Sequence, residues 1–167
     1  MESRSKPSDP TCPMCRLALG DDAELWSVKR PEVFQTPHWR CVLNGKDQRY
    51  PGRCILVSRR HVSAVPRLDG DEWQDLREAM GRLEEAGRIA FGASVANWGC
   101  LMNHAFQEPE PRPHVHWHYR PRHADPIELV GARFEDEAFG RHYLREYRVL
   151  DDEQILALRD RLRDAAG

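Results

Sequence analysis

Three histidines recur at every second position within residues 113–122 (PHVHWHYRPR), and this spacing constrains the fold more than any other feature of the chain. In an extended strand, alternate side chains share a face, so His114, His116 and His118 would lie in one row, about 7 Å apart. The apolar residues between them would pack on a core on the other face: Val115, Trp117 and Tyr119. An imidazole can act as a nucleophile, a general acid or base, or a metal ligand near neutral pH. The pattern therefore predicts a strand with a chemical role.

The composition is that of a soluble globular chain. Its 167 residues, 40% hydrophobic and 31% charged, suffice for one domain with a core. The net charge of −2 argues against a dedicated nucleic-acid partner, and no segment has the roughly 18 apolar residues of a membrane span. The first six residues lack the apolar stretch of a secretion signal, which predicts a cytoplasmic location. The odd count of five cysteines favours thiols or metal ligands over a disulfide framework.

Hydrophobic periodicity predicts strands, a helix, further strands and a last helix. Strands are expected at residues 24–29, 33–43, 53–58, 97–105 and around the histidines. A helix is expected over residues 71–91 and another from about Asp152, each preceded by a possible capping box (Asp69 with Glu72, Asp151 with Gln154). Without regular βαβ alternation, this order predicts an α+β fold with an antiparallel sheet.

Together with two neighbouring segments, the alternating histidines resemble the histidine triad (HIT) superfamily. Members carry His-φ-His-φ-His-φ-φ, where φ is apolar; this chain reads HVHWHYR, with Arg120 at the final position. The segment ILVSRRH, the amphipathic helix and Asn103, eleven residues before the first triad histidine, also match. The resemblance covers residues 12–123. It implies a HIT-like fold, with an antiparallel sheet of about five strands, one long central helix and a C-terminal helix.

The resemblance also implies a nucleotidyl hydrolase or transferase that cleaves at the α-phosphate of a nucleoside phosphate derivative. By position, His116 would be the nucleophile and would form a covalent nucleotidyl-histidine, which water or another acceptor then releases. His118 and His114 would complete the catalytic set. Asn103 and His61 would contact the nucleotide or its leaving group. Attack requires a neutral imidazole whose other ring nitrogen donates to an acceptor such as a backbone carbonyl, and it requires no metal.

One segment departs from the family pattern. Many members have Gly-Gln-Ser or Gly-Gln-Thr before the triad, whereas this chain has EPEPR at residues 108–112. Pro111 offers neither a hydroxyl nor an amide hydrogen, and Glu110 would repel a polyphosphate unless it pairs with a cation. Arg112 is the candidate nucleotide-binding residue that would replace the missing phosphate contact.

The pair Cys12 and Cys15 has the spacing of one half of a zinc site, and spacing alone leaves both zinc and simple buried thiols open. Several bacterial-type HIT proteins with this pair complete a tetrahedral site with the histidine after the Ile-Leu-Val strand and the first triad histidine, whereas other members carry the pair with no metal. The resemblance therefore implies a structural zinc with four ligands: Cys12, Cys15, His61 and His114. A zinc ion bound there would connect the N-terminus to the sheet, and its two histidine ligands would then not act as acids or bases.

Three functions are consistent with these features. The first is an enzyme whose ligand is a purine nucleotide or dinucleoside polyphosphate, with phosphoramidates and nucleotidyl sugars as further substrate classes. The second is a nucleotide-binding module with little turnover, which the altered segment 108–112 favours. The third is a zinc-stabilised interaction protein whose triad mainly serves metal. The resemblance further implies a homodimer.

The expected domain organisation has three parts. Residues 1–11 are polar and form a flexible N-terminus. Residues 12–123 form the HIT domain. Residues 124–167 form a C-terminal extension, irregular over residues 124–141, whose helix packs on the domain.

Overall fold

A five-stranded antiparallel sheet, in the spatial order β1-β2-β3-β5-β4, forms the centre of the molecule. The computed structural model describes residues 9–21, 32–142 and 147–167. The strands of this sheet are β1 (Glu32–Gln35), β2 (Trp39–Leu43), β3 (Cys54–Ser58), β4 (Val95–Gly99) and β5 (His116–Arg122). The predicted α+β architecture with an antiparallel sheet is confirmed.

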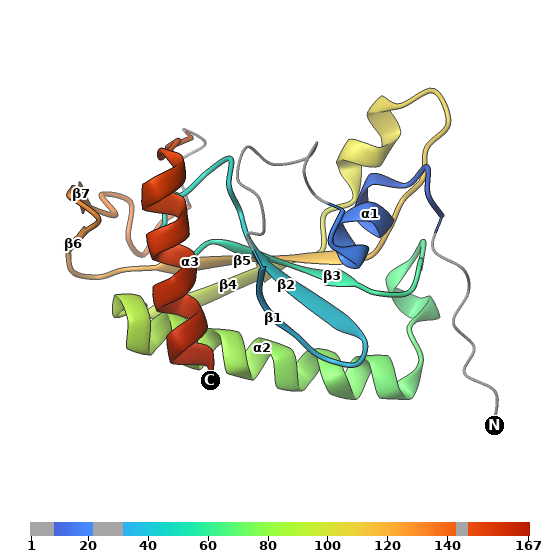
Figure 1. The fold of residues 1–167 in the computed structure, drawn as a ribbon, viewed down its shortest axis with the longest axis horizontal. Coiled ribbons are helices and arrows are strands. Elements are labelled where there is room, and N and C mark those ends of the chain that lie inside the picture. The colour runs from blue at the N-terminus through green and yellow to red at the C-terminus, as the bar shows by residue number, and fades with distance from the viewer. Residues whose placement is uncertain (1–8, 22–31, 143–146) are drawn as a thin grey trace.

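Helices cover both faces of the sheet unequally. The helical elements are α1 (Pro13–Leu19), η1 (Val65–Arg67), α2 (Gly70–Phe91), η2 (Asn103–Gln107) and α3 (Asp152–Ala166). The long α2 runs along one face and α3 packs against α2 and β1, whereas α1 and η2 lie on the other side of the sheet (Figure 1). None of the described helices combines the length and the apolarity needed to cross a membrane.

The two long helices begin and end where their sequence predicts. At the start of α2 the Asp69 carboxylate accepts from the Glu72 amide at 2.9 Å, and the Glu72 carboxylate accepts from the Asp69 amide at 2.9 Å. The helix ends at Gly92, which has a left-handed φ of 65°. The same reciprocal pair joins Asp151 and Gln154 at the start of α3. Both predicted capping boxes are confirmed.

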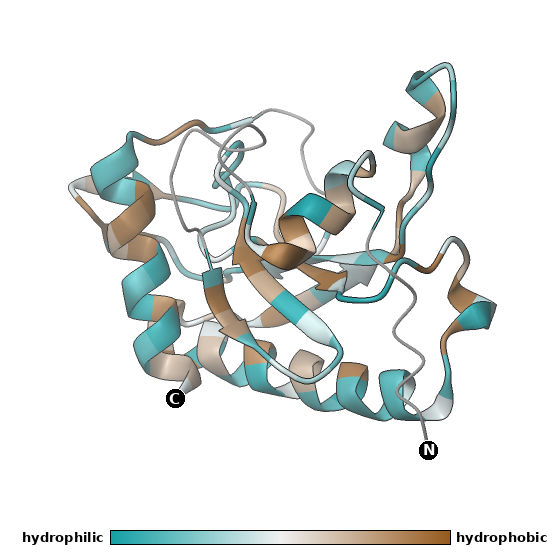
Figure 2. Cartoon of the chain, turned by 45° about the vertical axis from the view of Figure 1, so that its right-hand side comes forward, coloured by the Kyte–Doolittle hydropathy of each residue, from teal (hydrophilic) through white to brown (hydrophobic). Residues whose placement is uncertain are grey.

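Two separate sets of buried residues define the faces of the sheet. The main core lies between the sheet and α2, and Leu56 and Tyr119 contribute to it from β3 and β5. A smaller cluster lies on the opposite face, where Leu17 of α1 packs with Val42 and Ile55. Figure 2 shows hydrophobic residues on the side of α2 that faces the sheet and hydrophilic residues on its outer side. The face that carries α1 therefore has room for a site beside a small core.

The prediction of one continuous strand over residues 33–43 was wrong. The segment folds into two antiparallel strands, β1 and β2, joined by a turn in which Thr36 donates its amide to the Trp39 carbonyl at 2.9 Å. Pro37 has no amide hydrogen for a ladder, and Asp75 of α2 accepts from the Thr36 hydroxyl and from the His38 amide. The contact with α2 fixes the turn. The strand expected at residues 24–29 falls outside the described residues.

Two further predictions need correction. The strand expected over residues 97–105 ends at Gly99, and Asn103 begins the short helix η2. The ladder with β5 ends at the pair Gly99 and His118, two residues short of the start of β5 at His116. Residues 124–141, expected to be irregular, contain the strands β6 (Ile127–Leu129) and β7 (Ala132–Phe134), which pair with each other around a turn at Gly131.

Two glycines of α2 give a matched test of this packing. A Cβ at Gly87 would overlap the Tyr119 hydroxyl, whereas nothing lies within 4 Å of a Cβ at Gly81. We expect Gly87→Ala to lower the free energy of unfolding by about 1–3 kcal/mol through overpacking. Gly81→Ala should raise it by about 0.5–1 kcal/mol through helix propensity. Urea unfolding of both variants checks this, and equal shifts would contradict the packing of α2 on β5.

Candidate functional site

The strand β5 presents a row of polar side chains on the face of the sheet opposite α2. In the ladder with β3, His116 lies opposite Val57 and His118 opposite Ile55, and directly opposed residues share a face. Val57 and Ile55 pack with α1 and not with α2. Arg120 follows His118 at the same alternation. The row therefore runs from His116 to Arg120 on the α1 side of the sheet.

The ring of His116 is oriented by the backbone. Its Nδ1 atom lies 2.7 Å from the carbonyl oxygen of His114, so Nδ1 carries the proton and donates it there. The Nε2 atom then keeps its lone pair. Burial lowers the pKa of His116, and the nearby charge of His104 lowers it further, against the effect of the hydrogen bond to His114. The imidazole is therefore neutral near neutral pH, as nucleophilic attack requires.

His118 is the second imidazole of the row. Its ring centroid lies 5.1 Å from that of His116, with the planes at 73°. Burial lowers the pKa of His118 to about 3, and the charges of His116 and Arg120 act in the same direction. Its Nδ1 atom is buried and makes no hydrogen bond within the described part of the chain. The ring of His118 is therefore neutral near neutral pH.

The remaining predicted nucleotide contacts lie on and after η2. Asn103 is the first residue of η2 and is exposed. The guanidinium of Arg112 pairs with Asp9 at 2.7 Å and with Glu110 at 3.2 Å. Glu110 thus pairs with a cation, Arg112. Arg112 also connects the segment before the triad to the N-terminal part of the chain. A phosphate contact by Arg112 stays a prediction.

Sequence reasoning missed His104. His104 belongs to none of the motifs that the sequence analysis identifies, and it is exposed next to Asn103. Its charge nevertheless acts on the pKa of His116, which places it near that ring. No local pattern signals this proximity, because it arises from the turn of the chain after β4.

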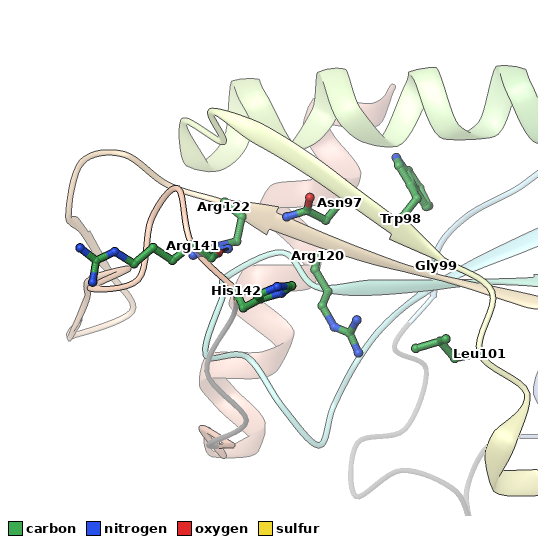
Figure 3. Close-up of a pocket in the computed structure, with 8 residues that line it drawn as sticks. All are labelled: Asn97, Trp98, Gly99, Leu101, Arg120, Arg122, Arg141 and His142. Carbon is green, nitrogen blue, oxygen red and sulfur yellow. Dashed lines mark hydrogen bonds between the residues drawn. The ribbon is translucent and has the colours of Figure 1, made fainter.

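A cavity of about 330 Å³ continues the row beyond His118. It lies over β4 and β5, and its wall includes Asn97, Arg120 and His142 (Figure 3). His142 belongs to the C-terminal extension. Among the residues of its wall, only Arg120 stands out in the sequence, because it occupies a position that is apolar in the HIT motif.

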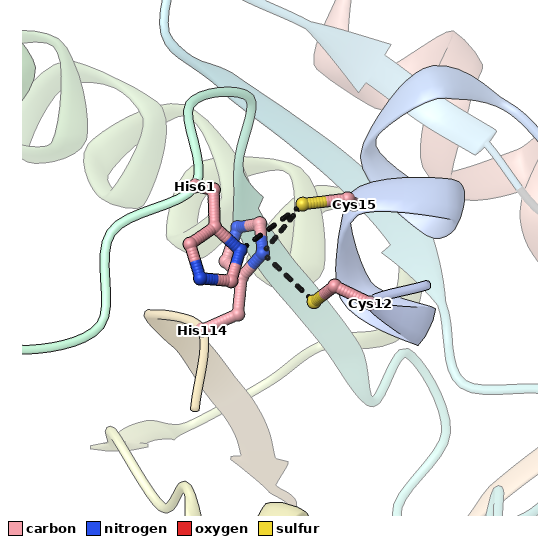
Figure 4. Close-up of side chains that lie close together, drawn as sticks. All are labelled: Cys12, Cys15, His61 and His114. Carbon is pink, nitrogen blue, oxygen red and sulfur yellow. Dashed lines mark hydrogen bonds between the residues drawn. The ribbon is translucent and has the colours of Figure 1, made fainter. Parts of the chain in front are cut away.

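A cluster of four potential metal ligands lies at the other end of the row. The Nδ1 atom of His114 lies 3.5 Å from the Cys12 sulfur and 3.4 Å from the Cys15 sulfur, and Nδ1 of His61 lies 3.2 Å from the Cys15 sulfur. All four ligand atoms lie within 4.8 Å of one another (Figure 4). The expectation that three imidazoles share one open face is corrected here: His114 precedes β5, and its side chain is buried among the cysteines.

The cluster fits a metal ion chemically. Two thiolates and two neutral imidazoles form the tetrahedral set that zinc prefers. The second nitrogen of His114, Nε2, lies 2.8 Å from the Ser58 carbonyl, which orients the ring as an outer-shell partner does. Burial raises the pKa of the Cys15 thiol to about 12, a cost that a bound cation would reverse. These four residues can therefore hold a metal ion.

Solved structures of histidine triad proteins match nearly the whole chain. A hypothetical histidine triad nucleotide-binding protein from Sulfolobus tokodaii is 13% identical over 93% of this chain and 91% of its own, with a TM-score of 0.63. A zinc-bound histidine triad family protein from Mycobacterium smegmatis is 15% identical over 92% and 94%, with a TM-score of 0.60. A Hit-like protein involved in cell-cycle regulation from Bartonella henselae is 16% identical over 96% and 99%, with a TM-score of 0.64.

The chain has the histidine triad fold. The HIT-like fold that the alternating histidines predicted is thereby confirmed. No protein-family model and no curated protein matches the sequence.

Metal content tests the four-residue cluster of the HIT fold. We expect the purified chain to bind about one divalent metal ion tightly, and Cys15→Ser to weaken binding by roughly 100-fold or more, because losing an outer-shell partner alone costs about 10–100-fold. Cys100→Ser is the control, since Cys100 lies outside the cluster. Elemental analysis and competition with a chelator give both values. Equal affinities in the wild type and Cys15→Ser would refute the site.

Proposed function

We propose that the chain is a HIT-type nucleotidyl hydrolase or transferase that acts at the α-phosphate of a purine nucleoside phosphate derivative. The observation that carries this proposal is the 2.7 Å hydrogen bond from Nδ1 of His116 to the His114 carbonyl. This bond fixes the tautomer whose Nε2 atom is the nucleophile. The depressed pKa of His116 supports the same role.

The proposed reaction has two displacement steps. In the first, the Nε2 lone pair of His116 forms a bond to the α-phosphorus while the bond from phosphorus to the leaving group breaks and its electron pair departs with that group. In the second, water or another acceptor attacks the phosphorus, loses its proton, and returns the electron pair of the P–N bond to Nε2. The neutral ring of His118 would donate a hydrogen bond to a phosphate oxygen or to the leaving group.

We assign the four-residue cluster to a structural zinc. A Cys₂His₂ set matches zinc in ligand type and number. Zinc would supply folding energy and no reaction step. His114 would bind it through its side chain while its carbonyl holds the ring of His116, and His61 would complete the set. In this assignment neither histidine acts as an acid or base, and the role of His114 in catalysis is to position His116.

A nucleotide-binding module with little turnover is the second candidate. The observation that favours it is the environment of Arg112, whose guanidinium is engaged by two carboxylates. The segment 108–112 then supplies no free cation for a phosphate, in contrast to the hydroxyl and amide of the family pattern. Binding of AMP without turnover would support this alternative.

Trapping of the covalent intermediate tests the enzyme proposal. Wild-type protein is incubated with diadenosine tetraphosphate or adenosine 5′-phosphoramidate, and intact mass and AMP release are measured. We expect an AMP adduct and AMP release, and a loss of rate on the order of 10⁴-fold or more in His116→Ala, the scale of losing a nucleophile.

His38→Gln is the matched control for this experiment. His38 lies in the turn between β1 and β2, and its amide contacts Asp75 of α2, on the face of the sheet away from His116. Its rate should equal that of the wild type. Release of AMP by His116→Ala at the wild-type rate would exclude this nucleophile, and binding without any release would favour the binding module.

We also propose that the chain forms a homodimer through the β4 edge of the sheet. Within the described residues, β4 pairs only with β5, so its outer edge is open. Val95 on this edge is 46% exposed and Ile89 on the adjoining α2 is 55% exposed. An open edge strand beside exposed apolar residues suits pairing with a second copy.

Light scattering tests this assembly. We expect twice the chain mass for the wild type and the mass of one chain for Ile89→Asp/Val95→Asp, because two carboxylates would be buried in the contact. Leu19→Asp is the control, since Leu19 is even more exposed than Val95 and Ile89 but lies at the end of α1 on the other side of the sheet. A monomeric wild type would refute the proposal.

A further inference from the structure

The turn after β4 carries an exposed imidazole, His104, to the face of the sheet that holds the polar row. The ladder between β4 and β5 ends at the pair Gly99 and His118, and the chain then leaves the sheet. Figure 3 shows this part of the chain turning away from α2, to the side of the sheet on which the Leu101 side chain lies. The short helix η2 follows, and His104 is its second residue. His104 therefore stands on the same side as the row.

Residues 100–104 lie beside the row at three points. The side chain of Leu101 borders the cavity that continues the row. Burial raises the pKa of the Cys100 thiol, and a hydrogen bond with the His116 backbone opposes that rise. The charge of His104 acts on the ring of His116. These observations agree with the end of the ladder, and they place the imidazole of His104 within electrostatic reach of the ring of His116.

The side chain of His104 is available for proton transfer. It is exposed, and it makes no hydrogen bond or ion pair with another residue in the described part of the chain. An imidazole exchanges protons with water near neutral pH, and it is the side chain that enzymes use most often as a general acid or base. An exposed ring near a reacting atom can thus deliver a proton to a substrate and recover it from solvent.

The other imidazoles around His116 are engaged or neutral. Nδ1 of His114 lies against the two cysteine sulfurs, and its Nε2 lies 2.8 Å from the Ser58 carbonyl. Nδ1 of His61 lies 3.2 Å from a cysteine sulfur. Burial lowers the pKa of His118 to about 3, so its ring holds no acidic proton near neutral pH. The two proton transfers that the proposed reaction requires therefore need another group.

We propose that His104 is the general acid and base of the nucleotidyl transfer at His116, a role that rests on the proposed function. In the first step, the bond from phosphorus to the leaving group breaks, and the leaving atom keeps its electron pair and takes a proton from the protonated ring of His104. In the second step, the neutral ring of His104 takes a proton from the attacking water. The new P–O bond forms as the electron pair of the P–N bond returns to Nε2 of His116. The ring of His104 is then protonated again.

One residue can serve both steps because of the geometry of in-line displacement. The leaving group departs from the side of phosphorus opposite His116, and water attacks from that same side when the P–N bond breaks. The two atoms that exchange a proton with His104 thus occupy the same place in turn. The charge of His104 also disfavours protonation of His116, because two imidazolium ions repel each other. The same residue therefore supplies the acid and helps to keep the nucleophile neutral.

Two substrates with different leaving groups test this role. The nitrogen of adenosine 5′-phosphoramidate must gain a proton to leave as ammonia, whereas the p-nitrophenyl ester of AMP releases a stable anion. We expect His104→Gln to slow formation of the AMP adduct from the phosphoramidate by about 100-fold or more. With the ester, the variant should release a first equivalent of p-nitrophenolate at the wild-type rate. It should then stall as the adduct on His116, because water lacks its base. Stopped-flow absorbance and intact mass give both rates.

The burst of p-nitrophenolate also shows that the variant is folded. His38→Gln is the matched control, because it makes the same change in the turn between β1 and β2 and should behave as the wild type with both substrates. If His104→Gln slows adduct formation equally with both substrates, the role of His104 is structural and the proposal is overturned. Wild-type rates of His104→Gln with both substrates would overturn it as well.

The same measurements separate this role from the proposed function. A wild type that forms no adduct with either substrate refutes the nucleotidyl function, and the role of His104 with it. An adduct that forms in the wild type and is absent in His116→Ala supports the function. Together with an unaffected His104→Gln, that result would keep the function and refute the role of His104 alone.

Discussion

The hydrogen bond from Nδ1 of His116 to the carbonyl of His114 is the interaction on which the candidate site depends. It links two residues that are two positions apart at the start of β5, because His114 turns its side chain into the cysteine cluster and its carbonyl toward the ring of His116. The Ser58 carbonyl holds the other nitrogen of His114. Any ion bound by the cluster would therefore restrain the ring of His116 through a single residue. The cluster of four potential metal ligands and the ring of His116 are thus coupled by backbone geometry, without a shared side chain.

The sheet holds this arrangement rigid because one face packs against the core and the other face carries the polar row. On the α2 face, Tyr119 is fully buried and its hydroxyl approaches Gly87, where only a glycine fits without displacement. On the other face, the same strand carries His116, His118 and Arg120. Close packing on one side fixes the register of β5, and the alternation of a strand then fixes the polar row on the other. The positions of the reactive side chains follow from the core behind them.

The sequence predicted those parts of the structure that follow from local patterns. The helix from Gly70 to Phe91 and both capping boxes depend on residues three or four apart, and they were placed correctly. The chain reversal at Pro37 was not predicted, because the turn is stabilised by a hydrogen bond from the His38 amide to Asp75, which lies 37 residues further along the chain. His104 was missed for the same reason. The pairing of β6 with β7 was overlooked although residues 127–134 alternate between apolar and polar, since each strand has only three residues.

Two departures from the family pattern both concern the placement of positively charged side chains. The segment before the triad lacks the hydroxyl and amide that would hold phosphate, and its one cation, Arg112, is bound to Asp9 and Glu110. The motif itself gains a cation at Arg120, in a position that is otherwise apolar, beside a cavity bordered by the C-terminal extension. The cation of the loop is thus engaged by carboxylates, whereas Arg120 lies on a strand whose register is fixed by the core. Because a residue on a packed strand keeps a fixed direction, the Arg120 side chain leaves the sheet on the same face as His116 and His118.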